Sequence, residues 1–348
     1  IDIDLQKSIE NIIISQLLEA KKEANTKYFN KIFVVIQNPK TGEILAMAGK
    51  QIIYRNATDY EILDFTPGVA TASVVPGSIV KGASHITGYN TGALKIGEVR
   101  YDRCVKLAAT PIKCSWKSLG TLNDLTALQQ SSNTYQFYTA MKVAGYNYVE
   151  EGAFKMKNNA FKLYRDTFNQ FGLGVKTGID LPVETEGFKG GDTVPGLLLD
   201  YSIGQYDTYS PLQLSQYIST VANNGNRMKL HLLKSVYSSE PTVLNKVVTK
   251  DEYLNRVKDG FKLVLSSGTG YGYMNNMYRP AGKTGTSQSF IDTNFDDKID
   301  TETITNTFGG YAPYDDPKVT FIIASPDISD NTTNFTSSVN KRVARLVS

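Results

Sequence analysis

The order of strand-like and helix-like segments along the 348 residues constrains the fold most strongly. Segments rich in Val, Ile and Phe, bounded by turn residues, predict strands at Lys31–Gln37, Glu43–Ala48, Asn306–Ala312 and Lys318–Ala324. Helical spacing of apolar residues covers 4–25, much of 78–200, Pro211–Asn223, Asp251–Ser266 and Val339–Leu346. Strands near both ends and helices between them predict an α+β fold. Its antiparallel sheet is built from both ends of the chain, and a helical lobe of roughly residues 82–200 is inserted.

Charge and hydropathy set limits on function. The 37 basic and 34 acidic residues give a net charge of +3, so bulk charge does not favour nucleic-acid binding. No apolar run reaches the roughly 18 residues of a membrane helix, and no signal peptide is visible. Because the chain also opens without methionine, we interpret it as a piece of a longer protein, with any N-terminal anchor outside it.

The first candidate motif is Ser78-Ile79-Val80-Lys81. If Ser78 begins a helix, Lys81 lies one turn further on the same face. A partly desolvated and neutral lysine can take the serine proton, and the backbone N–H groups at the helix start can stabilise an oxyanion. Alone the pattern is weak, because a capping serine followed by a solvated lysine would look the same.

A second motif, Ser131-Ser132-Asn133, follows after about fifty residues. Ser131 could relay a proton between Lys81 and a leaving amine. The Asn133 amide could hold a peptide bond through its donor and acceptor atoms. An ordinary polar turn is the alternative.

A third motif, Gly282-Lys283-Thr284-Gly285-Thr286, suits a strand that pairs with an extended peptide. Lys283 and the Thr286 hydroxyl could meet a terminal carboxylate, and Gly285 could let a substrate backbone approach closely. A surface strand with a stray lysine is the alternative. Together and in this order, however, the three motifs are specific for penicillin-interacting serine acyltransferases.

With these motifs the sequence resembles the class B penicillin-binding proteins. The resemblance extends over nearly the whole chain through Gly178–Pro182, Ser202–Gln205, Ser210–Leu214, Gly268–Gly270 and Phe308–Pro313. It implies a peptidoglycan D,D-transpeptidase domain over residues 1–348, with the family's five-stranded antiparallel sheet flanked by helices. It also implies an anchor and pedestal outside this chain and a place on the extracytoplasmic face of a bacterial membrane.

The resemblance also assigns roles to the matched positions. Ser78 would be the nucleophile, Lys81 the general base and Ser131 the proton shuttle. Substrate would be bound by Asn133, Lys283, Thr284, Gly285 and Thr286. The implied partners are stem peptides ending in D-Ala-D-Ala, β-lactams and a glycosyltransferase, and catalysis needs no cofactor.

Cys104 and Cys114 are the only cysteines and lie between the first two motifs. The extracytoplasmic setting that the resemblance implies favours a disulfide. A structural zinc site is the competing hypothesis, with Asp102 two residues before Cys104 and His85 four residues after Lys81 completing the ligands. Free thiols are the third possibility.

Two other functions remain open at this point. A D,D-carboxypeptidase or β-lactamase would use the same serine and lysine but pass the acyl group to water. A β-lactam sensor would be acylated and signal without turnover. The length of the chain and the segments around residues 178–225 favour the transpeptidase.

Overall fold

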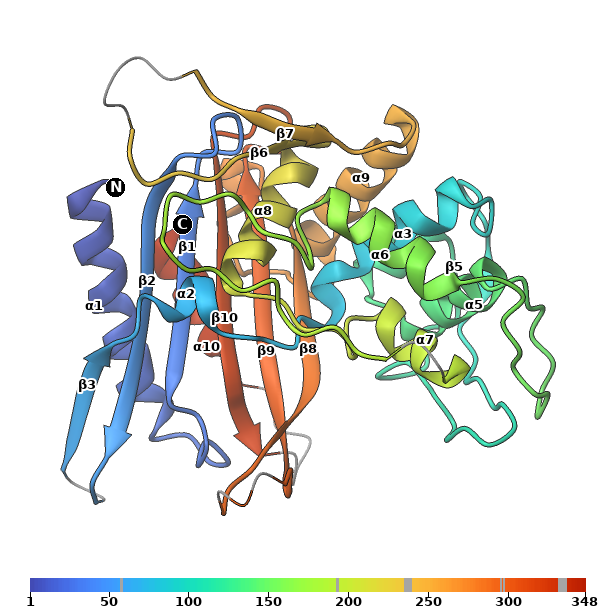
Figure 1. Ribbon diagram of the computed structural model, residues 1–348, viewed down its shortest axis with the longest axis horizontal. Coiled ribbons are helices and arrows are strands. Elements are labelled where there is room, and N and C mark those ends of the chain that lie inside the picture. The colour runs from blue at the N-terminus through green and yellow to red at the C-terminus, as the bar shows by residue number, and fades with distance from the viewer. Residues whose placement is uncertain (57–58, 192–193, 235–239, 295, 297, 331–336) are drawn as a thin grey trace.

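A computed structural model describes residues 1–56, 59–191, 194–234, 240–294, 296, 298–330 and 337–348. Its centre is an antiparallel sheet with the strand order β3-β2-β1-β10-β9-β8. The strands are β1 (Lys31–Gln37), β2 (Ile44–Tyr54), β3 (Tyr60–Asp64), β8 (Ala281–Ile291), β9 (Thr301–Ala312) and β10 (Val319–Asp330). The two ends of the chain meet where β1 pairs with β10, as the order of segments predicts (Figure 1).

The α+β class and the inserted helical lobe are confirmed, but the sheet has six strands rather than five. The additional strand is β3, which pairs with the second half of β2, from Lys50 to Tyr54. β3 is a short and largely exposed edge strand. Its sequence, Tyr-Glu-Ile-Leu-Asp, therefore lacks the buried apolar pattern by which the other strands are recognised.

Helices cover both faces of the sheet. Alternate residues of β1 point to opposite faces: Val34 packs in the apolar cluster with α1 (Ile3–Ala20) and α10 (Val339–Val347), and Val35 packs in the cluster that includes Leu212. Leu212 belongs to α8 (Pro211–Ala222), in which every residue is buried. Figure 1 shows α8 in front of the sheet and α1 beside β1 and β2.

The helical lobe lies to one side of the sheet, beyond β8 (Figure 1). Its helices are α3 (Lys81–Asn90), α4 (Asp124–Gln129), α5 (Asn133–Val143), α6 (Ala160–Gln170) and α7 (Pro195–Ser202). α9 (Asp251–Ser267) packs against both α4 and β8 and so bridges lobe and sheet. Within the described ranges, no helix combines the length and apolarity that crossing a membrane requires.

Short elements complete the chain. They are α2 (Gly68–Thr71), β4 (Arg100–Tyr101), β5 (Thr121–Leu122), β6 (Asn226–Met228), β7 (Val243–Lys246) and the 3₁₀ turns η1 (Gly77–Val80) and η2 (Asn276–Tyr278). The turn η1 packs against β8 and β9 and leads directly into α3. The junction between sheet and lobe therefore falls at the first sequence motif.

Candidate active site

Ser78 lies on η1, which is held close to β8 by glycines. Gly77 has a φ of +62°, and a Cβ added there would lie 2.6 Å from the carbonyl oxygen of Thr286. Its N–H donates to the carbonyl of Gly204 at 2.9 Å. A residue with a side chain at position 77 would be strained and would clash with β8. The Ser78 turn can therefore pack against β8 only because position 77 is glycine.

Gly285 serves the same contact from the β8 side. A Cβ at this position would lie 2.5 Å from the carbonyl oxygen of Pro76 and 2.1 Å from Oγ1 of Thr307. The space next to Gly285 is thus filled by the protein's own backbone. Glycine at this position admits the turn that carries Ser78, and the close approach of a substrate backbone to Gly285 stays a prediction.

Lys81 begins α3, one turn after Ser78, as the Ser-x-x-Lys spacing predicts. Its side chain is completely buried. Its amine donates to Oδ1 of Asn133 at 2.7 Å and to the carbonyl oxygen of Ser131 at 2.8 Å, and Oγ of Ser131 lies at 3.4 Å. The first two motifs, fifty residues apart in the chain, therefore meet at this amine.

The environment of Lys81 favours its neutral form. Burial lowers the pKa of its amine well below the usual value, the positive charge of Lys283 lowers this pKa further, and the negative charge of Asp102 partly opposes both. A neutral amine beside a serine can accept the hydroxyl proton. Such a shift in a cleft is typical of a functional lysine.

Ser131 connects the two lysines. Lys283 donates to Oγ of Ser131 at 2.9 Å and to the carbonyl oxygen of Thr284 at 2.8 Å. Ser131 has a φ of +55° just before α5, which turns its hydroxyl toward both amines. The Ser131 hydroxyl can therefore pass a proton in either direction.

Lys283 lies on β8, an edge strand that is paired only with β9 within the described part of the chain. Burial lowers the pKa of its amine to about 7. The next residue, Thr284, is half-buried and forms a hydroxyl contact of 2.9 Å with Thr269. Thr286 is exposed, so the third motif presents two threonines beside the Ser78 turn.

These groups line one cavity of about 600 Å³. Ser78, Ser131, Asn133, Thr284 and Thr286 all contribute to its wall. An open cavity of this size with convergent hydroxyls and a neutral lysine next to it suits acyl transfer to or from a peptide-sized substrate.

The chain that forms this cavity matches a known family. The family model described as the penicillin-binding protein transpeptidase domain matches residues 32–348. The chain belongs to the penicillin-binding protein transpeptidase family. The resemblance to its class B members is thereby confirmed.

Individual relatives agree with this assignment. Penicillin-binding protein 2A of Bacillus subtilis is 44% identical over 94% of this chain and 48% of its own length. The structure of penicillin-binding protein 2B from Streptococcus pneumoniae superimposes with a TM-score of 0.89 at 28% identity, covering 99% of this chain and 58% of that one. The peptidoglycan D,D-transpeptidase MrdA of Acinetobacter baumannii is 28% identical over 82% of this chain and 44% of its own. The chain spans about half the length of the curated relatives it matches.

The residues that were hypothesised to bind zinc are not gathered in this transpeptidase domain. Cys104 and Cys114 are joined in a disulfide, so their sulfurs are not thiolate ligands. The His85 ring is completely buried among other partners, with Nδ1 at 2.7 Å from Nε2 of Gln136 and Nε2 at 3.1 Å from the carbonyl oxygen of Asp124. In the ranges that the structure describes, no group of three or more His, Cys, Asp or Glu could hold a metal ion.

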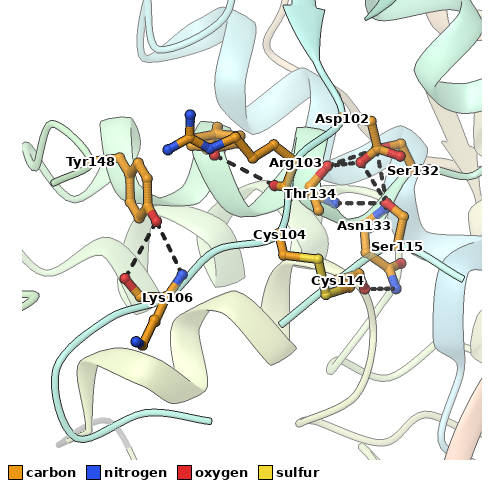
Figure 2. Close-up of a disulfide and its surroundings, with 11 residues drawn as sticks. Asp102, Arg103, Cys104, Lys106, Cys114, Ser115, Ser132, Asn133, Thr134 and Tyr148 are labelled. Carbon is orange, nitrogen blue, oxygen red and sulfur yellow. Dashed lines mark hydrogen bonds between the residues drawn. A yellow bond between two sulfur atoms is a disulfide. The ribbon is translucent and has the colours of Figure 1, made fainter. Parts of the chain in front are cut away.

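Asp102, the fourth hypothesised ligand, instead contacts hydroxyl groups near α5. Oγ of Ser115 donates to Oδ1 of Asp102 at 2.9 Å, and Oγ1 of Thr134 donates to the same oxygen (Figure 2). Proximity in the sequence suggested a metal ligand. The fold uses this carboxylate to hold the start of the helix that carries Asn133.

Several wall residues were missed by sequence reasoning. Trp116, Gln205, Tyr273 and Ile304 line the same cavity but belong to none of the three motifs. Trp116 is the only tryptophan, is 58% exposed, and donates from Nε1 to the carbonyl oxygen of Gln130 at 2.9 Å. Two signals were available in the sequence, the single tryptophan and the Ser202–Gln205 segment of the resemblance, whereas Tyr273 and Ile304 reach the cavity only through the fold.

Proposed function

We propose that this chain is the catalytic domain of a peptidoglycan D,D-transpeptidase that β-lactams acylate on Ser78. The observation that carries the proposal is that the buried amines of Lys81 and Lys283 contact Ser131 and Asn133, which line the Ser78 cavity. Membership of the penicillin-binding protein transpeptidase family supports it, as does the similarity to a protein named peptidoglycan D,D-transpeptidase.

In the first half of the reaction, the neutral Lys81 amine takes the proton of the Ser78 hydroxyl. Oγ of Ser78 then bonds to the carbonyl carbon of the penultimate D-Ala of a stem peptide. The resulting oxyanion would be stabilised by the backbone N–H groups of Ser78 and Thr286, which flank the contact between η1 and β8. Asn133 would hold the peptide bond through its amide.

Collapse of this intermediate breaks the C–N bond to the terminal D-Ala. The departing nitrogen takes up the proton from Lys81 through Ser131, whose hydroxyl contacts both lysine amines. An amine of a neighbouring stem peptide then attacks the Ser78 ester, and the same relay runs in reverse. The products are a cross-linked peptide and free Ser78.

Binding of the donor end would depend on β8. Its outer edge, which no other described strand pairs with, can add an extended peptide as another strand. Lys283 and the hydroxyls of Thr284 and Thr286 would receive the terminal carboxylate, which would raise the pKa of Lys283 and keep it charged. A β-lactam carries a carboxylate and a strained acyl bond in the same relative places.

The cellular setting belongs to the same proposal. A transpeptidase of this kind works on the extracytoplasmic face of a bacterial membrane, held by an N-terminal segment outside the present chain, with a glycosyltransferase supplying glycan strands. Similarity to class B penicillin-binding proteins supports the membrane location within this setting.

The direct test is acylation by a penicillin, followed by intact-protein mass spectrometry. We expect one adduct per chain, mapped to Ser78, that persists for minutes, and no adduct in Ser78→Ala. The matched control is Ser84→Ala, a buried serine of α3 outside the cavity. An adduct that cleared within seconds would support a β-lactamase instead, and no adduct on the wild-type chain would contradict the proposal.

A further inference from the structure

The segment between β4 and β5 forms a closed loop beside the active site. We call residues 102–120 the disulfide loop. β4 (Arg100–Tyr101) pairs with β5 (Thr121–Leu122), and the N–H of Asp102 donates to the carbonyl of Gly120 at 2.8 Å. The loop therefore leaves and rejoins the lobe at one point.

Inside this loop, a second closure brings its two arms together. The disulfide joins Cys104 to Cys114, and the neighbouring Val105 and Lys113 exchange backbone hydrogen bonds of 2.8 and 3.0 Å. The Lys113 amine also donates to Oδ1 of Asp200 at 2.6 Å, which ties this arm to α7. The position of Cys114 is thus fixed from two sides.

The closed arms hold the first turn of α5 from outside. Oγ of Ser115 accepts the backbone N–H groups of Asn133 at 3.0 Å and Thr134 at 3.3 Å. It donates in turn to Asp102, which also accepts from the Thr134 hydroxyl (Figure 2). The first N–H groups of a helix have no partner within the helix, so Ser115 supplies an acceptor that α5 lacks by itself.

The neighbouring residue, Cys114, sets the orientation of the Asn133 amide. The carbonyl oxygen of Cys114 accepts from Nδ2 of Asn133 at 3.3 Å. With its NH₂ group held there, the amide presents Oδ1 to the Lys81 amine at 2.7 Å. If the Cys114 carbonyl moved away, the amide would lose the acceptor that holds its NH₂ group in this orientation.

We propose that the disulfide loop is a positioning element for the Ser131-Ser132-Asn133 motif, acting through the Ser115 hydroxyl and the Cys114 carbonyl. Closure of the disulfide keeps both groups against α5, and they keep Asn133 and Ser131 against Lys81. This inference rests on the proposed function, because its readout is acylation of Ser78.

The first test removes one contact point. In Ser115→Ala we expect the first-order acylation rate by a fluorescent penicillin to fall about tenfold or more, since small misplacements of catalytic groups cost that much. The dissociation constant of the preceding complex should change by less than about threefold. Ser115→Thr keeps a hydroxyl and should recover most of the rate. Ile112→Ala, an exposed residue of the same loop, should leave the rate unchanged.

The second test opens the disulfide. Both cysteines are exposed, so a mild reductant can reach them in the folded protein. Reduction of the wild-type chain should lower the acylation rate about as much as Ser115→Ala does. The double variant Cys104→Ser/Cys114→Ser should be acylated at the rate of the reduced chain, and reductant should not change that rate further. A thiol count under denaturing conditions should find no free thiol before reduction.

The outcomes separate the two proposals. If the wild-type chain is not acylated, the proposed function fails. If it is acylated but the reduced chain and Ser115→Ala react at the wild-type rate, the positioning role is wrong. Two thiols in the unreduced chain, or one equivalent of zinc bound to it, would also overturn the inference. A third outcome would show a merely structural role. In that case the acylation rate would fall only in variants whose thermal unfolding midpoint also falls, and Ser115→Thr would be among them.

Discussion

Two lysine amines share the hydroxyl of Ser131, and the opposite tasks that we propose for them require different protonation states. Lys81 must be neutral to act as a base, and its pKa is lowered by burial and by the charge of Lys283. Lys283 must be charged to bind a carboxylate, although burial lowers its pKa to about 7 in the empty site. The charge of Lys283 therefore helps to keep Lys81 neutral.

This arrangement predicts a bell-shaped pH dependence for the second-order rate constant of acylation. The rate should rise as Lys81 loses its proton and should fall as pH passes through about 7, where Lys283 of the free enzyme loses its own. At saturating β-lactam the falling limb should move to higher pH, because the bound carboxylate raises the pKa of Lys283. Stopped-flow acylation across pH checks both limbs, and an identical falling limb in the two rate constants would contradict the role of Lys283.

The turn η1 and the strand β8 fit together through backbone contacts that leave no room for a methyl group. Gly77 has a positive φ and faces Thr286, and Gly285 faces Pro76. The close fit brings Ser78 of η1 and Thr286 of β8 to the wall of one cavity. The oxyanion site that we propose is thus a property of two packed elements and not of a single residue.

Gly77→Ala should disturb this fit. The added methyl would lie 2.6 Å from the Thr286 carbonyl oxygen, and its residue would adopt an unfavourable φ. We expect the free energy of unfolding to fall by about 2 kcal/mol or more, with a loss of acylation. Gly191→Ala is the matched control, since its methyl meets no atom within 4 Å among the residues that the structure describes. Urea denaturation of the three chains measures the difference, and equal midpoints would refute the packing argument.

The central helix α8 begins at a reciprocal cap. The Ser210 hydroxyl accepts the Gln213 N–H at 3.1 Å, and Oε1 of Gln213 accepts the Ser210 N–H at 2.9 Å. Pro211 occupies the first turn, where its missing N–H costs nothing. The sequence Ser-Pro-Leu-Gln therefore specifies this start locally, before any packing.

Loss of the cap should reduce stability by a modest amount. We expect Ser210→Ala to lower the free energy of unfolding by about 1 kcal/mol. Ser15→Ala on the exposed side of α1 should be neutral or slightly stabilising, because alanine favours a helix interior. Chemical denaturation of both variants tests this, and a larger loss at position 15 than at position 210 would contradict it.

The lobe and the sheet are joined by a buried ion pair between α4 and α9. Both nitrogens of the Arg256 fork donate to the fully buried Asp124 carboxylate, at 2.7 and 2.9 Å, and the Tyr89 hydroxyl donates at 2.7 Å. Burial alone would raise the pKa of Asp124, but the hydrogen bonds from Arg256 and Tyr89 lower it below its usual value. The pair stabilises the fold above the pKa of an unfolded carboxyl, and this contribution is lost as pH falls through the lower folded pKa.

Arg256→Met should leave the Asp124 charge buried without its partner. We expect a loss of about 3 kcal/mol in the free energy of unfolding. The double variant Arg256→Met/Asp124→Asn should recover part of this loss, because no charge is then left unpaired. Thermal unfolding of the single and double variants at neutral pH distinguishes the cases, and a double variant no more stable than the single one would argue against an unpaired charge as the cause.

The sequence by itself determined the segments and the chemistry that they carry. The apolar pattern located strands near both ends of the chain, which correspond to β1, β2, β9 and β10. The order of the three motifs identified Ser78, Lys81, Ser131, Asn133 and Lys283 as candidate site residues. It could do so because these signals are local: side-chain spacing, turn residues and caps act within a few positions.

Only the tertiary structure decided how distant segments meet. It added the short strand β3, replaced the hypothetical zinc site by a disulfide, and placed Asp102 and Ser115 at the start of α5. It also assigned Gly285 to the turn that carries Ser78. Contacts between residues far apart in the chain depend on the packing of whole elements, and no local pattern records them. The lowered pKa values of the two lysines are of the same kind, since burial and charge neighbours exist only in the folded chain.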